Sequence, residues 1–594
     1  MKFKIRTKIL PKNGLPPKMG SCESIFRKRS IEKSQIIDTD TGSLEGLKET
    51  YDGEKYDIYM GIPYAEPPVG NLRFQKTKPK EPWTGVRSCK KFGYRSVQKD
   101  MFWDTFNCIG PQNEDCLYLN IFGPELDPMK KYPVMFYIHG GGFMMDSSLR
   151  YTPRNVCRNL CSKGIIVVTI HYRLGYLGYF CTGDEASPGN YGLYDQIEAL
   201  KWVKKNIEQF GGDPDNITVA GQSAGAVSAD LLSLSPLSRD LFKNKMVLGA
   251  NSFCHWAVTT PEACRAYCRK KAVRLGWTAP HQFADLYEES RSIMDFMRKV
   301  PASKLGSHMI GKKLIFRDCV LPLAPVIGDE ALPRPLEELR KEAPEKPSIV
   351  GVGEQESLLF IAIGLMKCNR KELEQHISTL CRKTGRNMEE VLRQMNRLYG
   401  DSPQLRGSKR HLKEMIVTML SDIISNHAAY LYMRHHSEGK APCYVYSFDH
   451  SSKNTWGWLS AVVPFTAGTH TSEITYLFDC NYFSSPFPMN DTDKKVQKIM
   501  STYITLFIKN GTPNSNQLPE WRPVDPDRNL FDLQVMSITD MPQMKSKPFV
   551  NRMSQFYEYW EESQNTKGSN IAINDNRKIV DRTISISPTE HLRA

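Results

Sequence analysis

Short apolar runs recur along the chain between longer, more polar stretches. These runs have the length and the β-branched and aromatic content of buried strands, and they are Val134–Ile138, Ile165–Ile170, Ile217–Gly221, Lys245–Leu248, Ile349–Val352 and Tyr444–Phe448. Between two of them, apolar residues from Leu193 to Ile207 recur at spacings of four, three, three and four, which predicts an amphipathic helix. Alternating strands and helices predict an α/β fold with a large, mostly parallel or mixed central sheet and helices on both faces.

The two ends of the chain differ in composition from its centre. Residues 1–36 contain ten Lys or Arg and two Glu, a net charge of +8, and they show no hydrophobic period, which predicts a flexible basic extension. Residues 37–562 contain neither a low-complexity break nor a repeat, so we expect one domain there. Residues 563–594 are polar and lack aromatic side chains, which predicts a disordered tail.

The net charge of +14 does not by itself indicate nucleic-acid binding. More than half of the excess lies in residues 1–36, and no RNA- or DNA-binding motif accompanies it. No apolar run approaches the ~18 residues of a membrane-spanning helix, and no hydrophobic signal region follows the basic residues at the N-terminus. We therefore expect a cytoplasmic protein whose fifteen cysteines are mostly reduced.

One motif in the N-terminal extension concerns membranes. The sequence Met19-Gly20-Ser21-Cys22-Glu23-Ser24 fits the pattern for N-myristoylation, provided that translation starts at Met19. Myristoylation of Gly20 and palmitoylation of Cys22 would then attach the protein peripherally to a membrane. The alternative is a solvated tail with no such role.

The motif that indicates a reaction is Gly221-Gln222-Ser223-Ala224-Gly225. A strand-like run enters this Gly-x-Ser-x-Gly sequence and a run of small, helix-compatible residues leaves it, which is typical of a nucleophile elbow. At such a turn the serine backbone is strained, and Gly221 and Gly225 are expected to avoid crowding the nucleophile. Because the bare pattern also occurs by chance, Ser223 needs independent support.

A run of glycines provides that support. Strand Val134–Ile138 leads into His139-Gly140-Gly141-Gly142-Phe143, and the N–H groups of such a run can turn toward a substrate as oxyanion donors. Together with the N–H of Ala224, those of Gly141 and Gly142 would form a three-donor oxyanion hole. A glycine-rich turn without this role is the alternative, which the downstream Gly-x-Ser-x-Gly disfavours.

Further motifs follow one another along the chain. They are Gly61–Pro68 with Leu72–Phe74, Glu114–Asn120, Tyr172–Gly175, Gly189–Gln196 and Phe210–Pro214. In this order they resemble the type-B carboxylesterase/cholinesterase family over roughly residues 39–562. The resemblance implies the α/β-hydrolase fold and a serine, acid, histidine order for the catalytic residues. It also implies two structural ion pairs, Arg73 with Glu114 and Arg173 with Asp195.

The resemblance assigns the remaining two members of a catalytic triad. The acid falls on Glu356, with Glu354 as its nearest competitor because Ser357 stands where the family usually has glycine. The base falls on His470, within a segment, Gly468–Phe478, that matches the family's histidine loop. In the mechanism that this implies, His470 takes the proton of Ser223 while Glu356 orients the imidazole.

The implied function is serine-dependent hydrolysis of small-molecule carboxylic esters through an acyl-enzyme, with no metal or cofactor. Gln222 stands where cholinesterases carry Glu, which favours neutral over cationic esters. Trp256 resembles a residue that lines the family's acyl pocket, although a tryptophan of the core fits equally well. Two alternatives remain open: an acyltransferase that uses the same acyl-enzyme with an alcohol or amine acceptor, and a non-catalytic adhesion-type relative, which the retention of all three triad residues disfavours.

The resemblance also concerns the cysteines. In secreted members Cys116 pairs with a cysteine at about the position of Ser96, and the nearby Cys89 and Cys108 leave a substitute bridge open. A second family bridge would fall near Trp277, where no cysteine stands. These missing partners imply a reducing compartment.

Overall fold

The computed structural model describes residues 32–565, with gaps at 102–109, 281, 308–319, 370, 372–373, 376, 379–380, 382–386, 400–408, 437–438, 481–484, 486 and 526–532. The strands are β1 (Glu32–Thr39), β2 (Gly42–Tyr51), β3 (Glu54–Pro63), β4 (Val86–Ser88), β5 (Tyr118–Pro124), β6 (Tyr132–Ile138), β7 (Ile166–Ile170), β8 (Gly212–Gln222), β9 (Asn244–Leu248), β10 (Ser348–Gly353), β11 (Cys443–Phe448), β12 (Gln534–Ile538) and β13 (Gln543–Ser546). The α-helices are α2 (Pro153–Asn159), α3 (Gly175–Tyr179), α4 (Tyr191–Asn206), α5 (Ala224–Leu234), α6 (Pro261–Arg274), α7 (Leu286–Lys299), α9 (Leu336–Glu342), α10 (Ser357–Ala362), α12 (Met388–Tyr399), α13 (Lys409–Ser421), α14 (His427–His436), α15 (Lys453–Trp456), α16 (Ser472–Phe478), α17 (Asp491–Asn510) and α18 (Pro548–Asn565).

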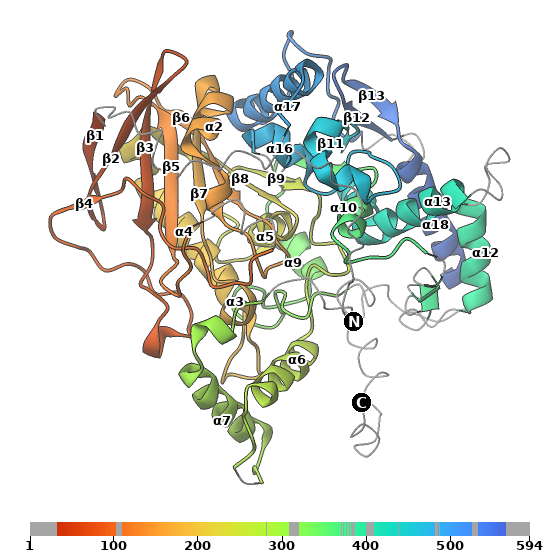
Figure 1. Cartoon of the computed structure of the whole chain (residues 1–594), viewed down its shortest axis with the longest axis horizontal. Coiled ribbons are helices and arrows are strands. Elements are labelled where there is room, and N and C mark those ends of the chain that lie inside the picture. The colour runs from red at the N-terminus through yellow and green to blue at the C-terminus, as the bar shows by residue number, and fades with distance from the viewer. Residues whose placement is uncertain are drawn as a thin grey trace, which may run out of the picture.

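All of these strands join one mixed sheet. Its order is β1-β2-β3-β5-β7-β6-β8-β9-β10-β11-β12-β13, and β4 pairs with β2. Neighbours from β7 to β12 run parallel, whereas β1, β2, β3 and β5 at one edge and β13 at the other pair antiparallel. Figure 1 shows the N-terminal strands in red and orange at one side and β12 and β13 in blue at the other. The predicted α/β-hydrolase architecture is confirmed.

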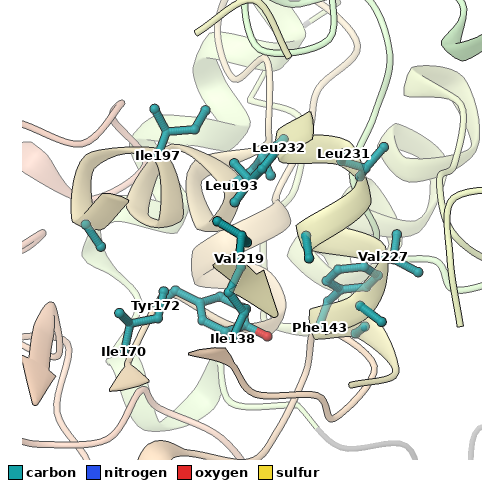
Figure 2. Close-up of a cluster of buried hydrophobic side chains, with 14 of the residues drawn as sticks. Ile138, Phe143, Ile170, Tyr172, Leu193, Ile197, Val219, Val227, Leu231 and Leu232 are labelled. Atoms are coloured by element: carbon teal, nitrogen blue, oxygen red, sulfur yellow. The ribbon is translucent and has the colours of Figure 1, made fainter. Parts of the chain in front are cut away.

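Alternation along the strands gives the sheet an apolar surface on each face. In β6, Val134 and Phe136 belong to one buried cluster and Met135 and Tyr137 to another, because successive side chains of a strand point to opposite faces. Helices α4 and α5 contribute to the first cluster, as Figure 2 shows, and α16 and α17 contribute to the second. A parallel sheet covered on both faces explains why the central strands read as nearly continuous apolar runs.

The predicted elements coincide with observed ones. Each of the six apolar runs lies in one of the strands β6 to β11, except that Ile165 lies one residue before β7. The helix predicted from Leu193 is α4, which a short 3-10 turn from Ile207 to Phe210 extends. The edge strands β1 to β5 and the pair β12 and β13 were not predicted.

The predicted domain boundaries fall inside regular elements. Strand β1 begins at Glu32, inside the expected extension 1–36, and α18 ends at Asn565, beyond the expected boundary at 562. The membrane-attachment motif with Met19, Gly20 and Cys22 lies outside the described residues. Within the described residues, no helix combines the length and the apolar character that a bilayer crossing requires.

The cysteines of the described residues are free thiols. Cys89 and Cys116 are both buried and unbridged, while Cys108 lies outside the described residues. Burial raises the pKa of the Cys89 thiol to about 12, so that thiol is protonated and unreactive at neutral pH.

Both predicted ion pairs are present, Arg173–Asp195 fully buried and Arg73–Glu114 partly buried. Arg73 Nη2 lies 2.5 Å from Glu114 Oε2, and Arg173 Nη2 lies 2.8 Å from Asp195 Oδ1. Asp195 also accepts hydrogen bonds from the Arg173 backbone N–H and from the Thr77 hydroxyl. The Arg173–Asp195 pair therefore joins the loop after β7 to α4 and to residue 77 of the N-terminal part of the chain.

Replacing Asp195 with Asn should strongly destabilise the protein. The change leaves the Arg173 guanidinium buried without its counter-charge, which costs about 3–5 kcal/mol. Urea unfolding measures this loss. Asp215→Asn provides the control, because Asp215 pairs with Lys204 at 2.9 Å while 89% of its side chain is exposed, and its loss should leave the stability nearly unchanged. Equal effects of the two changes would contradict the role given to the buried pair.

Candidate active site

Ser223 occupies a strained turn between β8 and α5. Its φ of 57° and ψ of −124° are unusual for any residue other than glycine. A Cβ at Gly225 would lie 2.1 Å from the Ile138 carbonyl oxygen, and one at Gly221 would lie 2.1 Å from the Gly225 carbonyl oxygen. The two glycines are therefore required by backbone packing against the end of β6 and within the turn, rather than by crowding of the nucleophile itself.

The structure brings the three predicted triad residues together. Ser223 Oγ lies 2.8 Å from His470 Nε2, and His470 Nδ1 lies 2.5 Å from Glu356 Oε2. Ser223 is 8% exposed, His470 3% and Glu356 0%. The serine thus retains limited access to solvent while its two partners are shielded, which is the arrangement that activates a hydroxyl nucleophile.

The parallel strands place these side chains at one edge of the sheet. Ser223 directly follows β8, Glu356 lies just after β10, and His470 lies in the loop that follows β11. The carboxyl ends of parallel neighbours meet at the same edge, where ligands bind in α/β sheets. Two of these strands, β10 and β11, are direct neighbours, whereas β9 separates β8 from β10.

Backbone and hydroxyl groups fix the acid and the base. Glu356 Oε1 accepts a hydrogen bond of 2.5 Å from the Gly353 N–H, so both carboxylate oxygens are engaged. The Thr469 hydroxyl lies 2.8 Å from the Gln355 carbonyl oxygen, to which it donates, and it accepts from the Leu359 N–H. Thr469 therefore ties the histidine loop to the segment that carries Glu356. The sequence gives no signal for Gly353 or Thr469 in these roles.

The competing acid, Glu354, lies elsewhere. Its nearest cation is Lys547 Nζ at 4.0 Å, and burial raises the pKa of this carboxyl. Ser357, whose presence left the register open, donates from its hydroxyl to the Val417 carbonyl and from its backbone N–H to the Ser421 hydroxyl. The contact with His470 therefore belongs to Glu356.

Three backbone N–H groups in the segments next to Ser223 lack a protein acceptor among the described residues. Those of Gly141, Gly142 and Ala224 donate to no acceptor in the part of the chain that the structure describes. Gly141 and Gly142 adopt φ values of 100° and 60°, and a Cβ at Gly140 would lie 2.7 Å from the Gln222 carbonyl oxygen and 3.0 Å from Ser223 Cβ. The glycine run thus packs directly against the turn that carries Ser223, as an oxyanion hole requires.

The two predicted substrate-pocket residues differ in their surroundings. Gln222 is buried, and its Nε2 lies 3.4 Å from His470 Nε2. Trp256 is half-buried, packs against the main core and donates its indole N–H to the Ile424 carbonyl oxygen at 3.0 Å. Gln222 therefore contacts the base directly, while the acyl-pocket role of Trp256 stays a prediction.

Glu473 is an acidic residue of this region that sequence reasoning missed. It is 1% exposed, and neither carboxyl oxygen has a hydrogen-bond partner among the described residues. Burial, together with the nearby Glu356 carboxylate, raises the pKa of Glu473 well above its ordinary value. The fold therefore favours the protonated, neutral form of Glu473, which lies three residues after His470.

Taken together, these groups can transfer protons and stabilise an oxyanion. The arrangement supplies a nucleophile, a base, an orienting acid and three backbone donors. Among the described residues, no group of three or more His, Cys, Asp or Glu side chains is placed to hold a metal ion.

Glu473→Gln should stabilise the protein at neutral pH. The unfolded chain releases the Glu473 proton above the ordinary glutamate pKa of about 4.3, whereas the folded state retains it, so the wild-type protein loses stability as the pH rises through that value. Glutamine is neutral in both states and avoids this loss. The loss in the free energy of unfolding is about 1.4 kcal/mol for each pKa unit by which the folded state raises the Glu473 pKa.

Urea unfolding between pH 4 and pH 8 measures this difference. The variant should exceed the wild type at pH 8 and approach it at pH 4. Glu520→Gln is the control, because Glu520 is exposed in a loop, so the same substitution is made there without a buried carboxyl group. A variant that is less stable at every pH would show that the carboxyl group makes favourable contacts as an anion.

Comparisons with known proteins agree with this geometry. Residues 33–556 match the model of the carboxylesterase family. The chain is 32% identical to esterase cest-33 of Caenorhabditis elegans over 494 residues, which cover 81% of this chain and 86% of that protein. It is 31% identical to gut esterase 1 of the same organism (83% and 87% covered) and 30% identical to carboxylesterase 1C of Mus musculus (86% and 90% covered). The chain belongs to the carboxylesterase family.

Proposed function

We propose that this carboxylic-ester hydrolase cleaves neutral esters through an acyl-enzyme formed on Ser223. The observation that carries the proposal is the continuous contact from Ser223 Oγ through the His470 ring to Glu356, with distances of 2.8 and 2.5 Å. A serine hydroxyl is a weak nucleophile until an adjacent base removes its proton. Membership of the family indicates ester hydrolysis, and this contact indicates which residues carry it out.

The proposed reaction has two halves. His470 Nε2 accepts the Ser223 proton as Oγ bonds to the ester carbonyl carbon, and the resulting imidazolium returns that proton to the leaving alcohol. A water molecule then gives a proton to His470 as its oxygen bonds to the acyl carbon. The imidazolium returns that proton to Ser223 Oγ as the bond between Oγ and the acyl carbon breaks and the carboxylic acid leaves. Throughout, Glu356 holds the imidazole by its Nδ1 and stabilises its positive charge.

The negative charge that develops on the carbonyl oxygen needs donors. Gly141, Gly142 and Ala224 are the proposed donors, because Ala224 directly follows Ser223, the glycine run packs on the Ser223 turn through Gly140, and none of the three N–H groups has an acceptor among the described residues. Each such donor contributes about 2.7–4 kcal/mol to the stability of a tetrahedral intermediate.

Gln222 supports a neutral substrate. Its amide lies against His470, where a carboxylate would attract a cationic alcohol group, and an uncharged amide offers no such attraction. An alcohol or amine that replaced water in the second half-reaction would make the same site an acyltransferase; the proposal is for water.

Cytoplasmic location and peripheral membrane attachment through the N-terminal region are further parts of the proposal. They are supported by the sequence motif that contains Met19, Gly20 and Cys22 and by the basic residues around it.

Ser223→Ala should abolish ester hydrolysis and labelling by a fluorophosphonate probe. Loss of the nucleophile should lower kcat by at least about 10⁴-fold, with the unfolding temperature nearly unchanged. Ser228→Ala is the matched control, because Ser228 is also buried and lies on α5, the helix that follows the Ser223 turn. Labelling that survives Ser223→Ala would overturn the assignment.

Product analysis in the presence of a competing alcohol separates hydrolysis from acyl transfer.

Gln222→Glu should shift the preference toward cationic esters. The new carboxylate would raise kcat/KM for a choline ester relative to its neutral 3,3-dimethylbutyl analogue by on the order of tenfold, given one partly buried charge pair. The ratio of the two kcat/KM values in wild type and variant measures the effect, and it cancels any general loss of activity. An unchanged ratio would show that Gln222 does not face the alcohol group.

A further inference from the structure

The loop that carries the oxyanion donors ends in a strained residue. After β6, positive φ values occur at Gly141 and Gly142, at Phe143 (59°) and at Asp146 (87°). Asp146 is not a glycine, and its φ lies beyond the usual left-handed value of about 57°. Such a conformation persists only where the surroundings enforce it.

One side chain clamps the backbone of this residue on both sides. Gln98 Oε1 accepts the Asp146 N–H at 2.7 Å, and Gln98 Nε2 donates to the Asp146 carbonyl oxygen at 2.9 Å. The same Nε2 donates to the Ser96 carbonyl oxygen at 3.2 Å, while the Gln98 backbone N–H is held by the Gln112 side chain. Gln98 is 6% exposed and Asp146 is 4% exposed, so water does not readily replace these bonds.

The side chain of Asp146 is fixed as well. Arg150 Nε donates to its Oδ1 at 2.5 Å, and the Ser147 N–H donates to the same atom at 2.8 Å. Burial would raise the pKa of this carboxyl, but the Arg150 guanidinium holds it below its ordinary value. Asp146 is therefore an anion that Arg150 and the Ser147 N–H hold on one side while Gln98 holds its backbone on the other.

This clamped residue adjoins the proposed oxyanion donors. The Gly141 carbonyl accepts the N–H groups of Met144 and Met145, and a Cβ at Gly141 would lie 2.0 Å from the Met145 carbonyl oxygen. The peptide that joins Met145 to Asp146 thus packs directly on Gly141. Rotation of Asp146 out of its positive φ would move this peptide and, with it, Gly141 and Gly142.

We propose that Gln98 is a positioning residue, which holds Asp146 in its left-handed conformation and thereby aims the Gly141 and Gly142 N–H groups at the reacting carbonyl oxygen. The inference rests on the proposed oxyanion role of these two glycines. Without the clamp, the strain at Asp146 is relieved by a rearrangement of the loop, and the donors leave the position where charge develops.

The test changes the Gln98 side chain and, separately, relieves the backbone strain at Asp146. Gln98→Met preserves volume but loses both hydrogen bonds to Asp146, and we expect kcat to fall at least about tenfold with KM nearly unchanged, because oxyanion donors act mainly in the transition state. The affinity for a trifluoromethyl ketone, which forms an oxyanion on Ser223, should fall by the same factor as kcat/KM. Gln98→Glu keeps the acceptor and loses the donor, and it serves if Gln98→Met does not fold; kcat should again fall.

The decisive comparison repeats the change in an Asp146→Gly background. Glycine adopts this φ without strain, so loss of the Gln98 clamp should lower kcat by less than about threefold there. Gln497→Met in α17, which removes a hydrogen bond from a half-buried amide to Asp479, is the control for the loss of one amide hydrogen bond away from the site. An unchanged kcat in Gln98→Met, or an equal loss in both backgrounds, would overturn the inference.

The proposed function fails by a different result, namely labelling or hydrolysis that survives Ser223→Ala.

Discussion

The close packing of the Ser223 turn against the end of β6 is the constraint on which the site depends. Three glycines permit it, because a Cβ at Gly225 would lie 2.1 Å from the Ile138 carbonyl oxygen, one at Gly221 2.1 Å from the Gly225 carbonyl oxygen, and one at Gly140 2.7 Å from the Gln222 carbonyl oxygen. This contact sets the nucleophile and the glycine run side by side before any substrate arrives. Preorganisation of this kind is what makes backbone donors effective, since no reorganisation is needed as charge develops.

The chemical residues of the site were accessible from the sequence because each lies in a local pattern. Ser223 stands within a Gly-x-Ser-x-Gly turn, and the oxyanion donors lie in a glycine run that follows an apolar strand. Glu356 and His470 needed the family resemblance, since nothing local distinguishes Glu356 from Glu354. The structure separates these two carboxyl groups by their contacts, with His470 in one case and Lys547 in the other.

The supporting residues were not accessible from the sequence. Gln98 meets Asp146 across 48 positions, and Thr469 meets Gln355 across 114; such pairs depend on how distant loops fold together. The same limit applies to the fold. The central strands are buried on both faces and read as apolar runs, whereas the edge strand β1 is mostly exposed, with only Ser34 and Ile37 buried, and begins inside a basic stretch. Charge and polarity at an edge strand hide it from a search for apolar runs.

The buried carboxyl groups of Glu356 and Glu473 differ in their hydrogen-bond partners, and this difference affects which of them carries a negative charge. Glu356 receives the Gly353 N–H and contacts the His470 ring, whereas Glu473 has no donor among the described residues. Two neighbouring carboxylates in a buried site repel each other, so one of them retains its proton. The Gly353 N–H and the His470 ring both contact the Glu356 carboxyl, which therefore lies against the imidazole that becomes positive during the reaction. A second anion at Glu473 would repel the charge on Glu356 without contacting the ring. The lack of hydrogen-bond donors around Glu473 in the described part of the chain favours its neutral form and lowers the free energy of unfolding at neutral pH. It also avoids a second negative charge beside the catalytic residues.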